Sequence, residues 1–140
     1  FLDWLNEETN EVVACLKSAE TPDEAIAAFV GTVTRFHTSN IDRYRMMYLA
    51  PQTLKAGMQE ARNSEVLDRI HATTSKLYEA LANRLEGPPD KARQTAFAIH
   101  SAALGVVLML GLAEGIGDPL KHSEEELVSA LTNKLSTEQC

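Results

Sequence analysis

The sequence contains little cysteine and little positive charge. Its two cysteines, Cys15 and Cys140, are too few for a disulfide-stabilised secreted scaffold, so we expect a protein of a reducing compartment such as the cytoplasm. Lysine and arginine number 13 against 20 acidic residues, which leaves a net charge of −7. This balance excludes a nucleic-acid-binding surface, because phosphate contacts need clustered cations. The length of 140 residues fits one domain, spanning 1–140.

The start of the sequence lacks both an initiator methionine and the basic and apolar regions of a signal peptide. We therefore expect this chain to be part of a longer protein. Long hydrophobic runs are also scarce: the uncharged segment 94–113 has the length of a membrane span, but it includes polar residues and has few flanking cations. A core helix buried on two sides is the favoured interpretation, and no contact with a membrane is expected.

Strand-like alternation of apolar and polar residues is absent, whereas apolar residues at three- and four-residue spacing recur along the whole chain. The sequence therefore predicts an all-α protein, a bundle of six helices. The expected ranges are 3–19, 22–38, 41–49, 52–86 with a break at 63–64, 90–115, and a last helix that follows residue 123.

Local signals mark several helix ends. Thr21 is followed three residues later by Glu24, and Ser123 is followed in the same way by Glu126, which is the pattern of a capping box. Pro51 is expected to end the third helix, because the residue before a proline is pushed out of helical geometry.

The run Tyr-Arg-Met-Met-Tyr at 44–48 resembles the Tyr-Arg-Leu-Met-Phe run of the ligand-binding half of tetracycline-repressor (TetR) regulators. In that family an aromatic residue, here Phe36, ends the preceding helix and a short link follows. The link often holds His-Pro, where this chain has Asn-Ile at 40–41. Segments 111–115 and 123–127 are also similar to the last two helices of the family, and the order of six helices matches over the whole chain.

This resemblance implies a function in transcription regulation. The chain would be the sensing and dimerising domain of a regulator that is not an enzyme and holds no cofactor. A small, mostly apolar effector would bind the domain and alter DNA binding by an N-terminal helix-turn-helix domain, which is missing from this sequence. The partners implied are a second copy of the chain, the effector, and DNA through the missing domain only.

Aromatic and methionine side chains are spread over most of the predicted helices, and the residues alone leave open whether they fill a core or line a cavity. The resemblance favours a cavity. Its lining is expected to be Phe29, Val33, Phe36, Met47, Ile70, His71, Thr74, His100 and Leu104.

The helix at 90–115 carries two apolar stripes, one through Ile99 and Val106 and the other through Leu104 and Leu108. Two stripes need partners on two sides, and we expect one partner to be a second subunit. The expected dimer interface consists of Leu108, Gly111, Leu112, Leu127, Leu131 and Leu135.

Two other classes of function remain open, a small helical enzyme or metal-binding bundle and a helical protein-interaction module. Asp68 and His71 lie one helical turn apart, but a metal site in a bundle uses two such acid–histidine pairs, so no metal is expected. Cys15 has no cationic neighbour in sequence that would activate it, and it is expected to be a small core residue.

Overall fold

The computed structural model describes residues 2–53, 64–118 and 120–137 of the chain. These ranges are almost wholly helical and contain no strand, so the expected all-α bundle is confirmed. The elements are α1 (Leu2–Leu16), α2 (Pro22–Thr38), α3 (Ile41–Tyr44), the π-helical η1 (Arg45–Leu49), α4 (Ala50–Thr53), α6 (Ser64–Ala82), α7 (Pro89–Ile116) and α8 (Glu124–Thr137). Because α3, η1 and α4 follow one another without a gap, they form one arm, and six helical units result. Residues 54–63 of the helix expected at 52–86 lie outside the described ranges.

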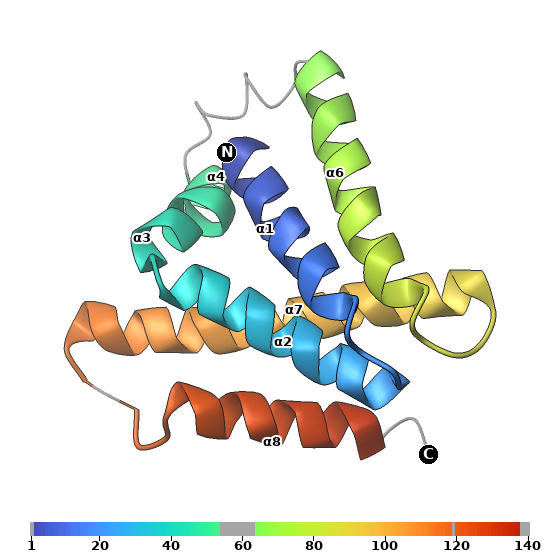
Figure 1. The fold of residues 1–140 in the computed structure, drawn as a ribbon. Helices are drawn as coiled ribbons and strands as arrows, with labels where there is room; N and C mark the ends of the chain where they lie inside the picture. Colours follow the sequence, from blue (N-terminus) through green and yellow to red (C-terminus); the bar gives the residue numbers. More distant parts are fainter. Residues whose placement is uncertain (1, 54–63, 119, 138–140) are drawn as a thin grey trace.

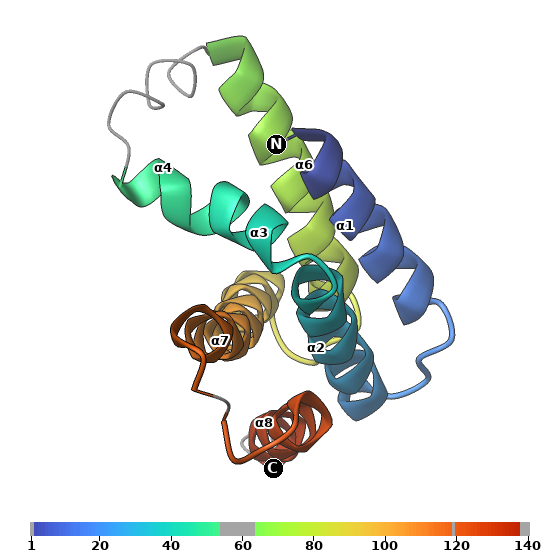
Figure 2. The same cartoon turned by 90° about the vertical axis from the view of Figure 1, so that its left-hand side faces the viewer.

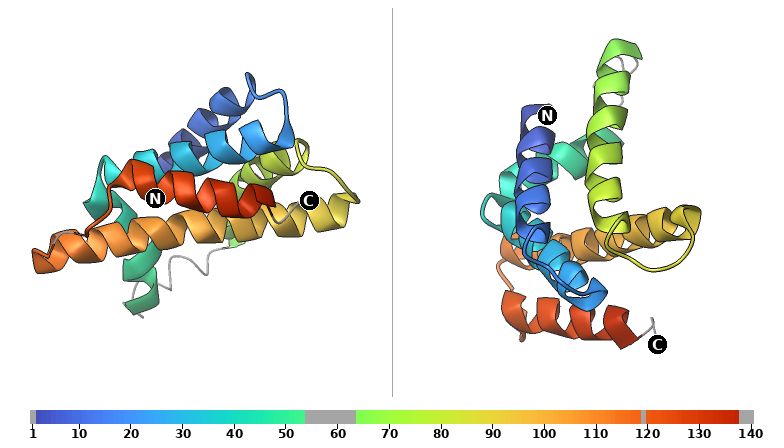
Figure 3. Two further views of the ribbon diagram at one scale, coloured as in Figure 1. Left: turned by 90° about the horizontal axis from the view of Figure 1, so that it is seen from below. Right: turned by 45° about the vertical axis from the view of Figure 1, so that its right-hand side comes forward.

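Helix α2 lies at the centre of the bundle and packs against α1, α7 and α8 (Figure 1). Helix α6 packs alongside α1 and α7, and the arm α3–η1–α4 leaves the end of α2 (Figure 2). Helices α7 and α8 run side by side in opposite directions (Figure 3). The molecule therefore has α1 and α6 on one side of α2, and α7 and α8 on the other.

The predicted capping box at Ser123 is confirmed in full and the one at Thr21 in part, because Glu24 accepts from Glu20 rather than from Thr21. The backbone N–H of Glu24 donates to Thr21 Oγ1 at 3.1 Å, and that of Glu20 donates to Glu24 Oε2 at 2.8 Å. At the start of α8, Glu126 N–H donates to Ser123 Oγ at 3.1 Å and Ser123 N–H donates to Glu126 Oε1 at 2.9 Å. Each box satisfies backbone donors that a helix start leaves free.

The helix end expected at Pro51 is wrong, because this proline lies inside α4. The preceding η1 is a π-helix, in which the Ala50 N–H reaches back five residues to the Arg45 carbonyl. A proline inside an α-helix removes one backbone hydrogen bond and crowds the carbonyl four residues earlier. The wider π turn just before Pro51 changes the hydrogen-bond register at this point, and the helical path continues past the proline.

Three other ends differ by a few residues. Helix α1 ends at Leu16 rather than Ala19 and α6 at Ala82 rather than Glu86. After α1 the N–H groups of Lys17 and Ala19 reach back three residues, and after α6 those of Arg84 and Leu85 do the same, which tightens the last turn. Helix α7 continues as far as Gly117, whose φ of +69° gives the left-handed conformation that ends the helix.

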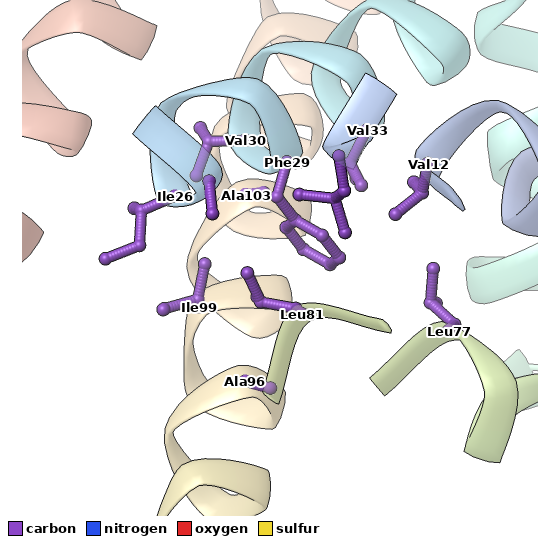
Figure 4. Packing of buried hydrophobic residues seen from close by; sticks show 12 residues of the cluster. Val12, Ile26, Phe29, Val30, Val33, Leu77, Leu81, Ala96, Ile99 and Ala103 are labelled. Carbon is purple, nitrogen blue, oxygen red and sulfur yellow. The ribbon is translucent and has the colours of Figure 1, made fainter. Parts of the chain in front are cut away.

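The core lies where α2 meets α1, α6 and α7. The ring of Phe29 is at its centre, close to Val12, Leu77 and Leu81 (Figure 4), and all four side chains are fully buried. Burial of each of these side chains contributes about 2 kcal/mol. Cys15 packs against the same cluster, as expected for a small core residue.

The buried face of α7 differs from both expected stripes, because it is made mainly of small residues. It runs through Ala92, Ala96, Ile99, Ala103, Val107 and Gly111. Small side chains allow α7 to lie close to α2 and to the arm, and a search for stripes of large residues does not detect them. Five large apolar residues of α7 are exposed instead: Phe97, Leu108, Met109, Leu112 and Ile116.

By length and composition α7 is long and apolar enough to cross a membrane, the only such helix in the described ranges. A third of its apolar window, 33%, is buried against the rest of the chain. It also carries the buried polar side chain of His100, and it packs on α2, α6 and α8. These contacts are those of a core helix with one open face.

The position of Phe29 predicts a large loss of stability on truncation. Phe29→Ala should lower the free energy of unfolding by about 3–5 kcal/mol, because the cavity it leaves is closed on all sides. Phe97→Ala is the matched control: Phe97 is 58% exposed, and its truncation should cost less than about 1 kcal/mol. Urea unfolding followed by circular dichroism measures both, and equal losses would contradict the assignment of the core.

Candidate functional site

Five polar side chains from five elements meet inside the bundle. They are Glu8 of α1, His37 of α2, Tyr48 of η1, Tyr78 of α6 and His100 of α7, and we call them the polar cluster. Figure 2 shows the helices that carry them converging around α2.

Glu8 faces the interior because it shares the buried face of α1 with Leu5 and Val12. Its carboxylate has no exposed surface, and neither has the imidazole of His37. His37 Nε2 lies 2.5 Å from Glu8 Oε2, and the hydroxyl of Tyr48 donates to Glu8 Oε1 at 3.3 Å. A buried carboxylate requires partners of this kind, since desolvation of an unpaired charge is very unfavourable.

The arm contributes two tyrosines to this region. The rings of Tyr44 and Tyr48 pack on the His37 ring, with centroid distances of 5.4 and 5.3 Å. The Tyr44 hydroxyl donates to the Leu104 carbonyl on α7 at 3.2 Å. Burial raises the pKa of Tyr48, and the Glu8 carboxylate adds to the rise, so this hydroxyl stays protonated. π-helical turns such as η1 are frequent at functional sites.

His100 and Tyr78 form the second half of the polar cluster. The Tyr78 hydroxyl lies 2.8 Å from His100 Nδ1. Burial raises the pKa of Tyr78 to about 12, with a further contribution from Glu8. Burial lowers the pKa of His100 to about 4, so the imidazole is neutral near pH 7. His100 Nε2 is buried and has no partner among the described residues.

The chemistry of the polar cluster favours binding over catalysis. The Glu8–His37 pair has no exposed surface, so a substrate cannot reach it without displacing the surrounding side chains. Within the described ranges no three His, Cys, Asp or Glu side chains gather as a metal site would require. His37 Nδ1 and His100 Nε2 are both buried without a hydrogen-bond partner among the described residues, and of the two histidines only His100 has any exposed surface, 4%.

The residues expected to line a cavity do not form one set. Phe29 and Val33 are sealed in the core, and Leu104 packs against it. His71 is exposed on α6, so its expected inward position is wrong. The Thr74 hydroxyl donates to the Ile70 carbonyl of its own helix at 3.0 Å, which leaves it unavailable as an inward-facing donor.

Two residues of the expected set, His100 and Phe36, do lie at the polar cluster. His100 belongs to it, and its ring meets the Phe29 ring edge-on at a centroid distance of 5.8 Å. The Phe36 ring packs edge-on against His37 at 5.1 Å. Met47 is buried within η1, and Ile70 is partly buried on α6.

The residues expected in the dimer interface divide into two groups. Leu108 and Leu112 are exposed on α7. Gly111, however, is buried beneath Ile41 of the arm, and an added Cβ would approach that side chain to 3.1 Å. Leu131 and Leu135 pack against the chain's own core. The single stripe of α8 therefore serves the fold, and the open apolar surface belongs to α7.

Surface hollows follow this open face of α7. One, of about 250 Å³, lies between the arm and the end of α7, and it is lined by Tyr44, Arg45, Leu49, Leu108, Gly111, Leu112, Gly115 and Ile116. Another lies between α7 and the start of α8, and its lining includes Leu127 together with Gly105, Val106 and Met109.

Sequence reasoning missed Glu8, His37, Tyr48 and Tyr78 as members of a site. A usable signal exists for two of them. Glu8 interrupts the apolar stripe of α1, and His37 directly follows the last aromatic residue of the stripe of α2. A titratable residue on the buried face of each of two consecutive helices indicates a buried pair.

No protein-family description, curated protein or solved structure matches the chain.

The low pKa of His100 predicts a loss of stability in acid. In the unfolded chain His100 takes up a proton near the ordinary histidine pKa of 6.5, but the folded imidazole does so only at about pH 4. Between these values the unfolded state binds more protons, so the free energy of unfolding falls as the pH falls. At about 1.4 kcal/mol per pH unit, the contribution lost over the window is about 3 kcal/mol.

Urea titrations across this window measure the effect. His100→Gln cannot titrate, so its free energy of unfolding should fall by less than that of the wild type. His71→Gln is the matched control, because His71 is exposed, and it should retain the wild-type fall. Identical pH profiles for all three proteins would contradict the buried, neutral state of His100.

Proposed function

We propose that this chain is the effector-sensing and dimerising domain of a TetR-like transcriptional regulator of the cytoplasm. The observation that carries the proposal is the division of α7 into two faces. One face carries His100 into the polar cluster, and the other presents large apolar side chains to solvent. A single helix thus joins a candidate effector site to a candidate subunit interface. DNA would be bound only through an N-terminal helix-turn-helix domain outside this sequence.

The exposed face of α7 supports the dimer. Leu108, Met109, Leu112 and Ile116 are between 43% and 65% exposed and lie on adjacent turns. Contiguous apolar surface of this kind marks sites of association. A two-fold axis brings the same patch of each subunit together, and such contacts are the commonest in homo-oligomers.

The arm supports coupling between effector and interface. Arg45 Nη2 donates to the Gly111 carbonyl at 3.0 Å and to the Glu114 carboxylate at 2.9 Å, both on α7. Tyr48 of the same arm belongs to the polar cluster. An effector that moves the arm therefore also disturbs α7 through these hydrogen bonds. The effector shifts the equilibrium between two arrangements of the arm and α7 only to the extent that it binds one of them more tightly.

Substitution on the open face of α7 tests the assembly. The wild-type chain should sediment at about twice its monomer mass at micromolar concentration. Leu112→Asp should give a folded monomer, because it places a charge on the apolar face. Val66→Asp, at an exposed apolar position of α6, is the matched control and should leave the dimer intact.

A substitution on α8 tests folding separately from dimer assembly. Leu131→Asp should lower helix content and stability, since Leu131 packs on the chain's own core. A wild-type chain that sediments as a monomer at these concentrations would refute the dimer. A Leu112→Asp protein that still sediments as a dimer would refute the proposed interface.

DNA binding provides a further test. The 140-residue chain alone should not retard duplex DNA at physiological salt, because its net charge is −7. An electrophoretic mobility assay measures this. Retardation that weakens steeply with added salt would show a cationic surface in this domain and contradict the proposed division of labour.

A further inference from the structure

We propose that the effector is an uncharged, flat apolar molecule that presents a hydrogen-bond acceptor, such as a ketone oxygen, to the Nε2–H of His100. The proposal rests on the sensing function proposed above and specifies the chemical class of the effector. It follows from the hydrogen bonding of His100, the rings around it, and the charges near it.

The tautomer of His100 is set by Tyr78. The Tyr78 hydroxyl is protonated at neutral pH and makes no other hydrogen bond to the described residues, so we assign it as the donor across the 2.8 Å contact and His100 Nδ1 as the acceptor. A neutral imidazole carries one proton, and with Nδ1 as the acceptor that proton is on Nε2. His100 Nε2 is therefore a hydrogen-bond donor.

This donor lacks a partner. Nε2 is buried and makes no hydrogen bond to any described residue, and the whole residue is 4% exposed. An N–H group without a partner inside a protein is unfavourable, and binding an acceptor removes that penalty. A hydrocarbon of the same shape gains nothing at this atom, so the donor discriminates between the two ligands.

Aromatic rings surround the imidazole. The centroids of Phe29, Tyr48 and Tyr78 lie 5.8, 6.5 and 5.4 Å from that of His100. Phe97 continues the series outward, 5.3 Å from Tyr78, and it is exposed. The rings thus form a continuous series from the exposed Phe97 to the buried His100. Flat apolar molecules pack well against such rings.

The charges near the polar cluster select against ions. Glu8 raises the pKa of both Tyr48 and Tyr78, so its negative charge is felt at the His100 side. At His100 itself, burial is the largest influence on the pKa, and of the two charges that act there Glu8 outweighs the opposing His37, so an anionic ligand would be repelled. A cation would face the Nε2–H donor, which cannot accept a hydrogen bond from it. Arg93, the cation that acts on Tyr78, is already paired with Glu79 at the surface.

Two probes of matched shape test the inference. Acetophenone carries a ketone oxygen, and α-methylstyrene keeps the same trigonal carbon with a methylene group in place of that oxygen. The ratio of their affinities for the complete chain, measured by ligand-observed NMR titration, reports the hydrogen bond separately from apolar binding. His100→Phe should lower the preference for acetophenone about tenfold, the size typical of one hydrogen bond.

Two further variants act as controls. His100→Gln retains an N–H donor near the position of Nε2, and it should keep most of the preference. His71→Phe makes the same substitution as the test variant at an exposed histidine of α6, and it should leave the ratio unchanged. Benzoate, the anionic analogue, should bind more weakly than acetophenone.

The outcomes separate this inference from the proposed function. If both probes bind and His100→Phe leaves their ratio unchanged, the role of His100 is refuted and the sensing function stands. If benzoate binds more tightly than acetophenone, the uncharged class is refuted. If neither neutral probe binds at millimolar concentration, the sensing function itself is contradicted, and the inference falls with it.

The tautomer of His100 can be tested directly in the wild-type chain, first without a ligand and then with the two probes. In the wild-type chain labelled with ¹⁵N-histidine, long-range ¹H–¹⁵N spectra near pH 7 should show His100 neutral with its proton on Nε2. Addition of acetophenone should shift the resonance of that proton, and α-methylstyrene should leave it in place. A proton on Nδ1 would overturn the inference whatever the probes do.

Discussion

The buried carboxylate of Glu8 holds three elements together through its hydrogen bonds with the imidazole of His37 and the hydroxyl of Tyr48. A carboxylate without exposed surface must find partners inside the protein, and here they come from α2 and, through Tyr48, from the arm. Removal of one partner from such a pair costs about 3–5 kcal/mol, because a buried charge is left behind. The register of α1 against α2 and the position of the arm therefore depend on these contacts.

The arm is attached in a different way from the rest of the bundle. Its side chains reach backbone carbonyls on neighbouring helices: Arg43 donates to Phe36, Tyr44 to Leu104 and Arg45 to Gly111. Tyr44 and Met47 are its buried apolar side chains. Segments with few apolar contacts open at lower free energy than the core. The arm is thus the described element best suited to respond to a ligand, and its hydrogen bonds end on α7.

Local chemistry explains which features the sequence predicts. The capping boxes at Thr21 and Ser123 involve residues three apart, so their partners are visible in the sequence. The buried face of α7 is set by close approach to α2, which favours alanine over larger residues and gives no stripe of large side chains. Pro51 continues a helix only because of the π turn before it. The partner that buries Glu8 lies 29 residues away, so this pairing shows only when the apolar stripes of two helices are compared.

Gly105 lies on the open side of α7. A glycine inside a helix is unfavourable by about 0.5–1 kcal/mol relative to alanine, so its position needs a physical reason. Gly111 has one within the chain, because Ile41 lies where a Cβ would be. At Gly105 an added Cβ meets no described atom within 4 Å. It lines the hollow beside Met109 on the open side of α7. A second α7 that approaches closely at this point supplies the missing reason, which favours the two-fold assembly proposed above.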